Sequence, residues 1–341
     1  MAIKKPVGVA LIGAGRIGTS HTTIIARRLV DAELVAVADP APGAAERLAK
    51  ELDCRVATTD VAAVLDNREV EAVVIATPAR FHANLVEQAA NAGKAVFCEK
   101  PMALTLADAD RAIAAARANG VPLQVGFNRR WDQAFAEGRA AIDTGKIGTP
   151  QLLRSLTRDP GPFGADPARI PQWTIFYETL IHDFDTLLWL NSGAKPVEVY
   201  AAADALIRPD FKEHGHLDTA VVTIRFDNGA IAVAEANFSA LYGYDVFGEV
   251  FGSAGMVTMG DVRRSSMTLF DKAGISNDTW RLDTDLFIDA YTAQLAAFVA
   301  AVRGATPSGA TGVDARTALA VALACVESVK ANAPVKLSDL R

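Results

Sequence analysis

Short apolar runs alternate with helical patterns along residues 1–125. The apolar runs have the length of buried strands and lie at Val7–Ile12, Leu34–Ala38, Val73–Thr77, Ala95–Cys98 and Leu123–Phe127. Between them, apolar residues recur at helical spacing over Arg16–Leu29, Ala44–Leu52, His82–Ala92 and Leu106–Asn119. Because strands that alternate with helices pair in parallel, this part of the chain predicts a doubly wound α/β domain.

The pattern changes over residues 126–341. One helical segment, Ile175–Leu190, carries charged residues within an apolar pattern. Strand patterns then dominate, at Val197–Ala203, Thr219–Phe226, Ala230–Phe238, Val246–Gly252 and Met256–Met259. Two helical patterns, Phe287–Arg303 and Ala315–Ala331, follow near the end of the chain. We therefore expect a second, α+β domain with a large, mostly antiparallel open sheet, whose last helices pack back onto the first domain.

The first strand runs directly into a glycine-rich turn, Gly13-Ala14-Gly15-Arg16-Ile17-Gly18. Such a turn between a strand and a helix lets a pyrophosphate approach the helix N-terminus. The second strand ends on Asp39, about 20 residues after the last glycine, where a carboxylate accepts hydrogen bonds from the ribose hydroxyls of NAD. A tight turn without a ligand is the alternative, which the presence of Asp39 disfavours. The sequence thus predicts an NAD-binding Rossmann domain over residues 1–125.

Composition and charge narrow the class of protein. A chain of 341 residues is long enough for two domains. Its net charge of −6 does not indicate a surface that binds nucleic acid. Its apolar runs are too short to span a membrane. The three cysteines, Cys54, Cys98 and Cys325, form neither a disulfide framework nor a metal-binding spacing. We expect a cytoplasmic protein without a metal.

Two polar clusters suggest chemistry at a hydroxyl group. Glu99-Lys100-Pro101 follows a strand, and the proline biases Lys100 away from helical geometry, although these three residues alone also fit a surface lysine. Glu178, His182 and Asp185 share one face of a regular α-helix. A carboxylate one turn before a histidine can orient its ring, and such a histidine can accept the proton that an alcohol loses on oxidation. The alternative is a solvated helix face; His21 is expected on the surface of the first helix.

The order of these motifs resembles the Gfo/Idh/MocA oxidoreductase family across essentially the whole chain. The matching segments are Gly13–Gly18, Ala76-Thr77-Pro78 with Phe81-His82, Glu99-Lys100-Pro101, Gly126–Arg130 and Ile181–Asp185. Within the family, the inositol 2-dehydrogenases are the most similar, through Leu153–Asp159, Tyr242–Asp245 and Gly252–Gly255.

The resemblance implies roles for individual residues. Lys100 and His182 take catalytic roles, with Glu178 standing where the family has an aspartate. The cofactor contacts implied are Gly13, Gly15, Arg16, Ile17, Gly18, Asp39, Thr77, Pro78, His82, Glu99 and Lys100. The substrate contacts implied are Asn128, Arg129, Thr157, Asp159, Asp185 and Tyr244. Of these, Asn128, Thr157 and Asp159 replace residues typical of the inositol enzymes, so the substrate is expected to be a cyclic polyol but is not fixed as myo-inositol.

These implications predict an NAD-dependent dehydrogenase that oxidises a secondary hydroxyl of an inositol or, second, of a pyranose sugar. A non-enzymatic NAD-binding sensor or co-regulator and an NAD-dependent glycosidase are the alternatives. The presence of Lys100 and His182 disfavours the sensor, and a glycosidase would retain its cofactor through each turnover. Apolar residues on both faces of the second-domain sheet predict a homo-oligomer, a tetramer or a dimer.

Overall fold

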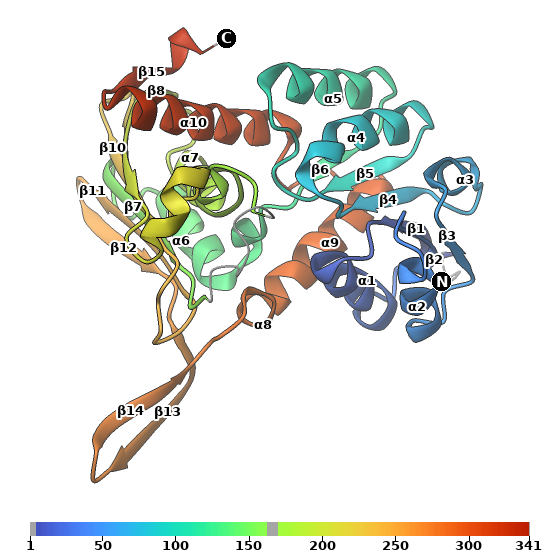
Figure 1. Ribbon diagram of the computed structural model, residues 1–341, viewed down its shortest axis with the longest axis horizontal. Helices are drawn as coiled ribbons and strands as arrows, with labels where there is room; N and C mark the ends of the chain where they lie inside the picture. The colour runs from blue at the N-terminus through green and yellow to red at the C-terminus, as the bar shows by residue number, and fades with distance from the viewer. Residues whose placement is uncertain (1–4, 162–169, 341) are drawn as a thin grey trace. The chain divides into compact units, whose positions relative to one another are not determined.

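The computed structural model describes residues 5–161 and 170–340 (Figure 1). The chain divides into two compact units, which are described separately below. Unit 1 comprises Met1–Trp131 and Ile288–Arg316, and unit 2 comprises Asp132–Phe287 and Thr317–Arg341. Within the described ranges, none of the helices has the length and apolarity needed to cross a membrane.

Unit 1 is built on a parallel sheet of six strands in the order β3-β2-β1-β4-β5-β6. The strands are β1 (Val7–Ile12), β2 (Ala32–Ala38), β3 (Val56–Thr58), β4 (Ala72–Ile75), β5 (Ala95–Cys98) and β6 (Leu123–Val125). Every residue of β1, β4 and β5 is buried, as expected for central strands covered by helices on both faces. The predicted doubly wound Rossmann fold is confirmed.

The helices of unit 1 lie near their predicted positions. They are α1 (Arg16–Arg28), α2 (Ala44–Glu51), α3 (Val61–Asp66), α4 (His82–Asn91), α5 (Leu106–Ala118) and α9 (Ile288–Val302), with short 3-10 turns η1 (Ala79–Phe81) and η2 (Asn128–Trp131). α9 comes from late in the chain and packs against α1 and η2. The sequence reading omitted β3 and α3, because elements of three and six residues are too short to show a period.

Unit 2 is built on a sheet of seven strands in the order β12-β11-β7-β10-β9-β8-β15. The strands are β7 (Pro150–Arg158), β8 (Pro196–Asp204), β9 (Thr219–Phe226), β10 (Ile231–Asn237), β11 (Asp245–Gly252), β12 (Gly255–Met259) and β15 (Val335–Lys336). All neighbouring pairs are antiparallel except β7 and β10, which are parallel. This confirms the predicted large, mostly antiparallel sheet.

One face of this sheet is covered by helices and the other is exposed. The helices that contain residues of unit 2 are α6 (Gln133–Asp143), α7 (Leu180–Leu190), α8 (Asp283–Leu286) and α10 (Gly312–Ala331), with short turns η4 (Ile175–Thr179), η5 (Pro209–His214) and η6 (Leu337–Asp339). α7 packs against β7 and β10. Strand β9 shows the alternation clearly, since Val222 and Ile224 are fully buried whereas Val221 and Arg225 are exposed.

A two-stranded ribbon, β13 (Arg263–Asp271) and β14 (Gly274–Thr279), extends from unit 2 (Figure 1). Nearly all of its residues are exposed, including the apolar Phe270 and Ile275, which pair across the two strands. The sequence reading assigned no strand there, because the segment lacks the alternating pattern that one buried face produces.

Candidate functional site

The three glycines of the first turn have different structural roles. Gly13 has a φ of 104°, and a Cβ at this position would lie 2.7 Å from the carbonyl carbon of Ala76. A Cβ on Gly18 would lie 2.0 Å from the carbonyl oxygen of Gly13, so α1 can pack on the turn only with glycine there. Around a Cβ on Gly15, no described atom lies within 4 Å. Gly13 and Gly18 therefore serve the fold, while Gly15 leaves space for a ligand to approach the backbone.

The N-terminus of α1 is open beside this turn. Gly15 is the N-cap residue and supplies no side-chain hydrogen bond to the first helical N–H groups. Arg16 is exposed and Ile17 is half-buried at the first turn of the helix. The positive end of the helix dipole attracts anions, so this turn fits the pyrophosphate of a dinucleotide.

Asp39 is joined directly to the glycine turn. Its Oδ2 accepts a hydrogen bond of 2.7 Å from the Ala14 N–H, and its Oδ1 accepts one of 2.8 Å from the Ala41 N–H. The side chain is half-buried at the end of β2. Each carboxylate oxygen can accept more than one hydrogen bond, so this arrangement leaves acceptor capacity for ribose hydroxyls.

His82 links the ends of two parallel strands. Its ring is buried, with Nε2 2.7 Å from the carbonyl oxygen of Thr77 and Nδ1 2.7 Å from that of Pro101. Burial lowers the pKa of His82, and a neutral ring donates to only one carbonyl at a time. Pro78 is exposed, while the Thr77 hydroxyl is buried and has no partner in the described parts of the chain. An orphaned hydroxyl at the carboxyl end of β4 is consistent with a ligand bound there.

A buried hydrogen-bonded pair, His21 and Glu99, lies next to Lys100. Nε2 of His21 donates to Oε1 of Glu99 over 2.7 Å, and Oε2 of Glu99 accepts a hydrogen bond of 3.1 Å from the Lys100 N–H. Both His21 and Glu99 are buried, so the expectation of a surface position for His21 is wrong. The reason is that α1 presents His21 to the rings of Phe97 and Tyr291. Residues distant in sequence bury this histidine, which a local pattern cannot indicate.

The helix that carries His182 begins with an irregular turn. Residues Ile175–Thr179 form the π-helical turn η4, and α7 begins at Leu180. Glu178 lies in η4, whereas His182 and Asp185 lie on α7. A π turn takes more residues than an α turn, so the expected regular spacing from Glu178 to His182 is not present. His182 is half-buried and Asp185 is buried.

Strand β7 contributes two hydroxyls that bind one buried acid. The Thr157 hydroxyl donates to Oδ2 of Asp183 over 2.7 Å, and the Ser155 hydroxyl donates to Oδ1 over 2.6 Å. Thr157 was expected to contact the substrate, but its hydroxyl donates a hydrogen bond to Asp183. Sequence reasoning gave no role to Asp183, whose only signal was its place beside His182. Beyond the strand, Oδ1 of Asp159 accepts a hydrogen bond of 2.7 Å from the Gly161 N–H.

The remaining predicted substrate residues lie on separate elements. Asn128 and Arg129 are buried in η2 of unit 1. Arg130, next to them, lies 3.5 Å from Asp314 in an ion pair. Tyr244 precedes β11 in unit 2, and its N–H donates to the carbonyl oxygen of Trp280 over 2.8 Å.

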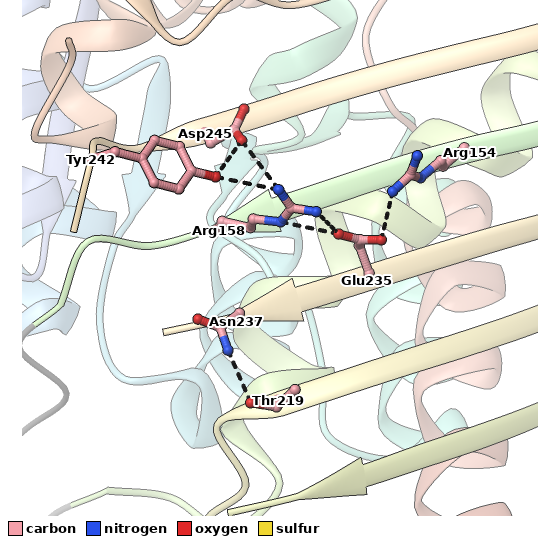
Figure 2. A network of polar contacts seen from close by, with 7 residues as sticks. All are labelled: Arg154, Arg158, Thr219, Glu235, Asn237, Tyr242 and Asp245. Carbon is pink, nitrogen blue, oxygen red and sulfur yellow. Dashed lines mark hydrogen bonds and ion pairs between the residues drawn. The ribbon is translucent and has the colours of Figure 1, made fainter. Parts of the chain in front are cut away.

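The exposed face of the unit 2 sheet carries a polar network (Figure 2). Glu235 accepts hydrogen bonds from Arg154 over 2.9 Å and from Arg158 Nε over 3.0 Å. Burial would raise the pKa of Glu235, but the two guanidinium groups outweigh it and hold the pKa below its ordinary value. Tyr242 donates to Asp245 over 2.7 Å and accepts from Arg158. The network joins β7, β10 and β11 on the face opposite to Ser155 and Thr157.

Exchange of Gly15 and Gly18 for alanine should separate ligand binding from packing. Gly15→Ala is expected to retain the thermal stability of the wild type and to weaken the binding of NAD about tenfold or more, because the new methyl group occupies the space for the pyrophosphate. Gly18→Ala is expected to lose about 2 kcal/mol or more of stability, because its Cβ meets the Gly13 carbonyl. Thermal denaturation and NAD titration calorimetry measure both. Equal NAD affinities for Gly15→Ala and the wild type would contradict the assignment.

The buried pair behind Lys100 should make stability depend on pH. Burial would raise the pKa of Glu99, but His21 and Lys100 outweigh it, so the pKa lies below the ordinary value of 4.5. The ionised carboxylate therefore stabilises the fold above that value, and this contribution is lost as pH falls through the folded-state pKa. Urea unfolding from about pH 6 to pH 3 should show a steeper loss for the wild type than for Glu99→Gln. The exposed control Glu51→Gln should follow the wild type; identical slopes for all three would refute the role of this pair.

Comparisons with known proteins cover almost the whole chain. A family model described as "Oxidoreductase family, NAD-binding Rossmann fold" matches residues 7–127, and the GFO/IDH/MocA C-terminal domain matches residues 135–258. The chain is 37% identical over 339 residues to the inositol 2-dehydrogenase of Rhizobium meliloti strain 1021, covering 97% of this chain and 99% of the relative. It is 34% identical over 333 residues to the myo-inositol 2-dehydrogenase of Thermotoga maritima, with coverage of 97% and 99%.

A solved structure gives the same result at the level of the fold. The scyllo-inositol dehydrogenase of Lactobacillus casei, with bound NAD(H) and scyllo-inositol, matches with a TM-score of 0.94 and 28% identity. The match covers 98% of this chain and 100% of that one. The open Gly15 turn, the Asp39 carboxylate and the orphaned Thr77 hydroxyl fit NAD as the cofactor. This chain belongs to the Gfo/Idh/MocA family of NAD-binding oxidoreductases.

Proposed function

We propose that this protein oxidises a secondary hydroxyl of a cyclic polyol, an inositol, to the ketone with NAD as the hydride acceptor. The observation that carries the proposal is the full-length likeness to inositol 2-dehydrogenases, at 34–37% identity with nearly complete coverage of both chains. The presence of Lys100 and His182 in the matching motifs adds to it.

The chemistry assigned to these residues is a coupled loss of a proton and a hydride. His182 accepts the hydroxyl proton as the carbon–oxygen double bond forms and hydride leaves the same carbon. The family resemblance assigns the orientation of the imidazole to Glu178, which lies in the π turn just before α7, and the polarisation of the reacting oxygen to Lys100. NAD, held by the glycine turn and Asp39, would supply the acceptor for the hydride. Gly15 leaves room for the pyrophosphate beside α1, and Asp39 accepts hydrogen bonds from the ribose hydroxyls, while Gly13 and Gly18 keep the turn in the required shape.

A neutral substrate with several hydroxyls suits the remaining polar residues. Asn128, Arg129, Asp159, Asp185 and Tyr244 offer both donors and acceptors, and each buried hydroxyl of a polyol needs a partner. Recognition of a carboxylate or phosphate would call for two converging cations. Arg130 is adjacent to Arg129, but it is already paired with Asp314. This pairing supports a neutral ring over an anionic sugar.

A substrate panel tests the proposed function. The values of kcat/KM for myo-inositol, scyllo-inositol, glucose, xylose and a sugar acid are measured by NADH formation. We expect an inositol to be the best substrate and NADH to accumulate in step with the polyol consumed. A preference for glucose or xylose would favour a pyranose dehydrogenase of the same family, and a preference for the sugar acid would overturn the proposal. Turnover without NADH accumulation would favour a glycosidase.

Removal of the base tests the mechanism in the same assay. His182→Ala should lose about 10²–10⁴-fold in kcat. Its NAD affinity should stay normal, because the dinucleotide contacts belong to unit 1 and His182 belongs to unit 2. The exposed His214→Ala is the matched control and should retain full activity. Near-normal turnover by His182→Ala would remove the base assignment.

We also propose that copies of the chain associate through the exposed face of the unit 2 sheet. A row of four apolar residues crosses β12, β11, β7 and β10 in register, formed by Met256, Phe251, Leu152 and Ile231. These side chains are 46–53% exposed. Closed symmetric assembly is a common way to cover such a face, and a tetramer is the expected form.

The three free thiols are consistent with a reducing, cytoplasmic location.

Light scattering at micromolar concentration tests the assembly. The wild type should have the mass of a homo-oligomer, and Ile231→Lys should shift it toward smaller species because it places a charge within the apolar row. Val30→Lys changes a more exposed apolar residue of unit 1 and should leave the mass unchanged. A monomeric wild type would refute the proposed association.

A further inference from the structure

A carboxylate outside the predicted catalytic set is fully buried in unit 2. Asp183 has 0% of its surface exposed, and so has Ser155, while Thr157 is 1% exposed. The two hydroxyls donate to different oxygens of the acid, over 2.6 and 2.7 Å. Both distances lie in the shorter half of the range for O–H···O hydrogen bonds. One acid on α7 therefore holds two alternate residues of β7.

Such an arrangement is expensive if packing is its only purpose. A carboxylate removed from water loses its hydration, and apolar side chains of the same volume would join a helix to a sheet at no such cost. Buried polar contacts have a property that apolar contacts lack, since they are satisfied at only one register and rotation of the two elements. The Asp183 pair of hydrogen bonds thus fixes α7 on β7 in a single position.

This contact fixes the part of α7 that carries two residues of the proposed active site. Asp183 follows His182 directly, and Asp185 lies two residues further along α7. On the other side, Asp159 directly follows the end of β7 and lies two residues after Thr157. Arg154 and Arg158 lie next to Ser155 and Thr157 along the chain and point to the opposite face, where they bind Glu235 (Figure 2).

We infer that Asp183 is a positioning residue, which holds His182 and Asp159 in a working arrangement by clamping α7 to β7 through Ser155 and Thr157. The inference rests on the proposed function and deepens it. It also changes the role of Thr157, which acts through Asp183 and does not select the substrate. A displacement of about 1 Å in a proton acceptor is enough to cost on the order of 100-fold in rate.

Four single variants test the clamp by steady-state kinetics with the best polyol of the panel. Thr157→Val keeps the shape and removes the hydroxyl, Thr157→Ser keeps the hydroxyl, and Ser155→Ala removes the second donor. Asp183→Asn keeps one acceptor oxygen and can still hydrogen-bond both hydroxyls. We expect Thr157→Val and Ser155→Ala each to lower kcat about 10- to 100-fold with an unchanged KM for NAD. Thr157→Ser and Asp183→Asn should stay within about threefold of the wild type, because the hydrogen bonds are restored.

A double-mutant cycle decides between the clamp and a direct substrate contact. In an Asp183→Ala background, Thr157→Val should cause no further loss of kcat, because the partner of the hydroxyl is already absent. If Thr157 contacts the substrate, Thr157→Val raises the KM for the polyol by the same factor in both backgrounds and leaves kcat unchanged. That result would overturn the inference, and so would a Thr157→Ser variant as impaired as Thr157→Val.

Hydrogen–deuterium exchange separates this inference from the proposed function. Amides of α7 should exchange at least about tenfold faster in Thr157→Val than in the wild type and Thr157→Ser, whether or not any polyol is oxidised. If the wild type oxidises no polyol but the exchange rates differ in this way, the proposed function is wrong and the positioning role of Asp183 stands. Unchanged exchange in α7 defeats the clamp even if the enzyme is fully active on inositols.

Discussion

The close contact between Gly18 and the carbonyl oxygen of Gly13 is the constraint on which unit 1 depends. A methyl group on Gly18 would push α1 away from the turn that precedes it, and one on Gly13 would collide with the backbone of Ala76 and Thr77. In the same turn, the Ala14 N–H donates to the Asp39 carboxylate, and Gly15 caps α1 without a side-chain hydrogen bond. The close packing of α1 on the end of β1 therefore determines the shape of the proposed dinucleotide site.

In unit 2, polar contacts fix the relative positions of the sheet and a helix. Its sheet and helix are held in register by polar groups, since the Asp183 carboxylate binds two hydroxyls of β7 on the covered face. On the exposed face, Glu235 joins Arg154 and Arg158 of the same strand. Strand β7 is thus fixed from both sides. The same buried-acid arrangement occurs behind Lys100, where Glu99 binds His21 and the Lys100 backbone. Both units hold a predicted catalytic residue next to a buried carboxylate.

Sequence alone predicts the features that depend on local pattern. The alternation of strands and helices and the glycine turn with Asp39 both depend on neighbours a few residues apart or on their order along the chain. The family and its cofactor follow from the order of these motifs. The burial of His21 depends on Phe97 and Tyr291, which are distant in the chain, and the partner of Thr157 is 26 residues away. The π turn at Ile175–Thr179 and the ribbon of β13 and β14 also leave no periodic signal. Tertiary contacts decide these features, and a single sequence does not report them.

Unit 1 is assembled from two stretches of chain with the body of unit 2 between them. Its α9 packs on α1 and η2, and Tyr291 of that helix contacts the ring of His21. During synthesis, residues 132–287 leave the ribosome before α9 does. The cofactor-binding unit is therefore the first to begin folding and among the last to be completed, with the His21 side of α1 uncovered in the interval. A truncated chain that ends before Ile288 would carry every residue predicted to contact the dinucleotide and still lack the helix whose Tyr291 packs against His21.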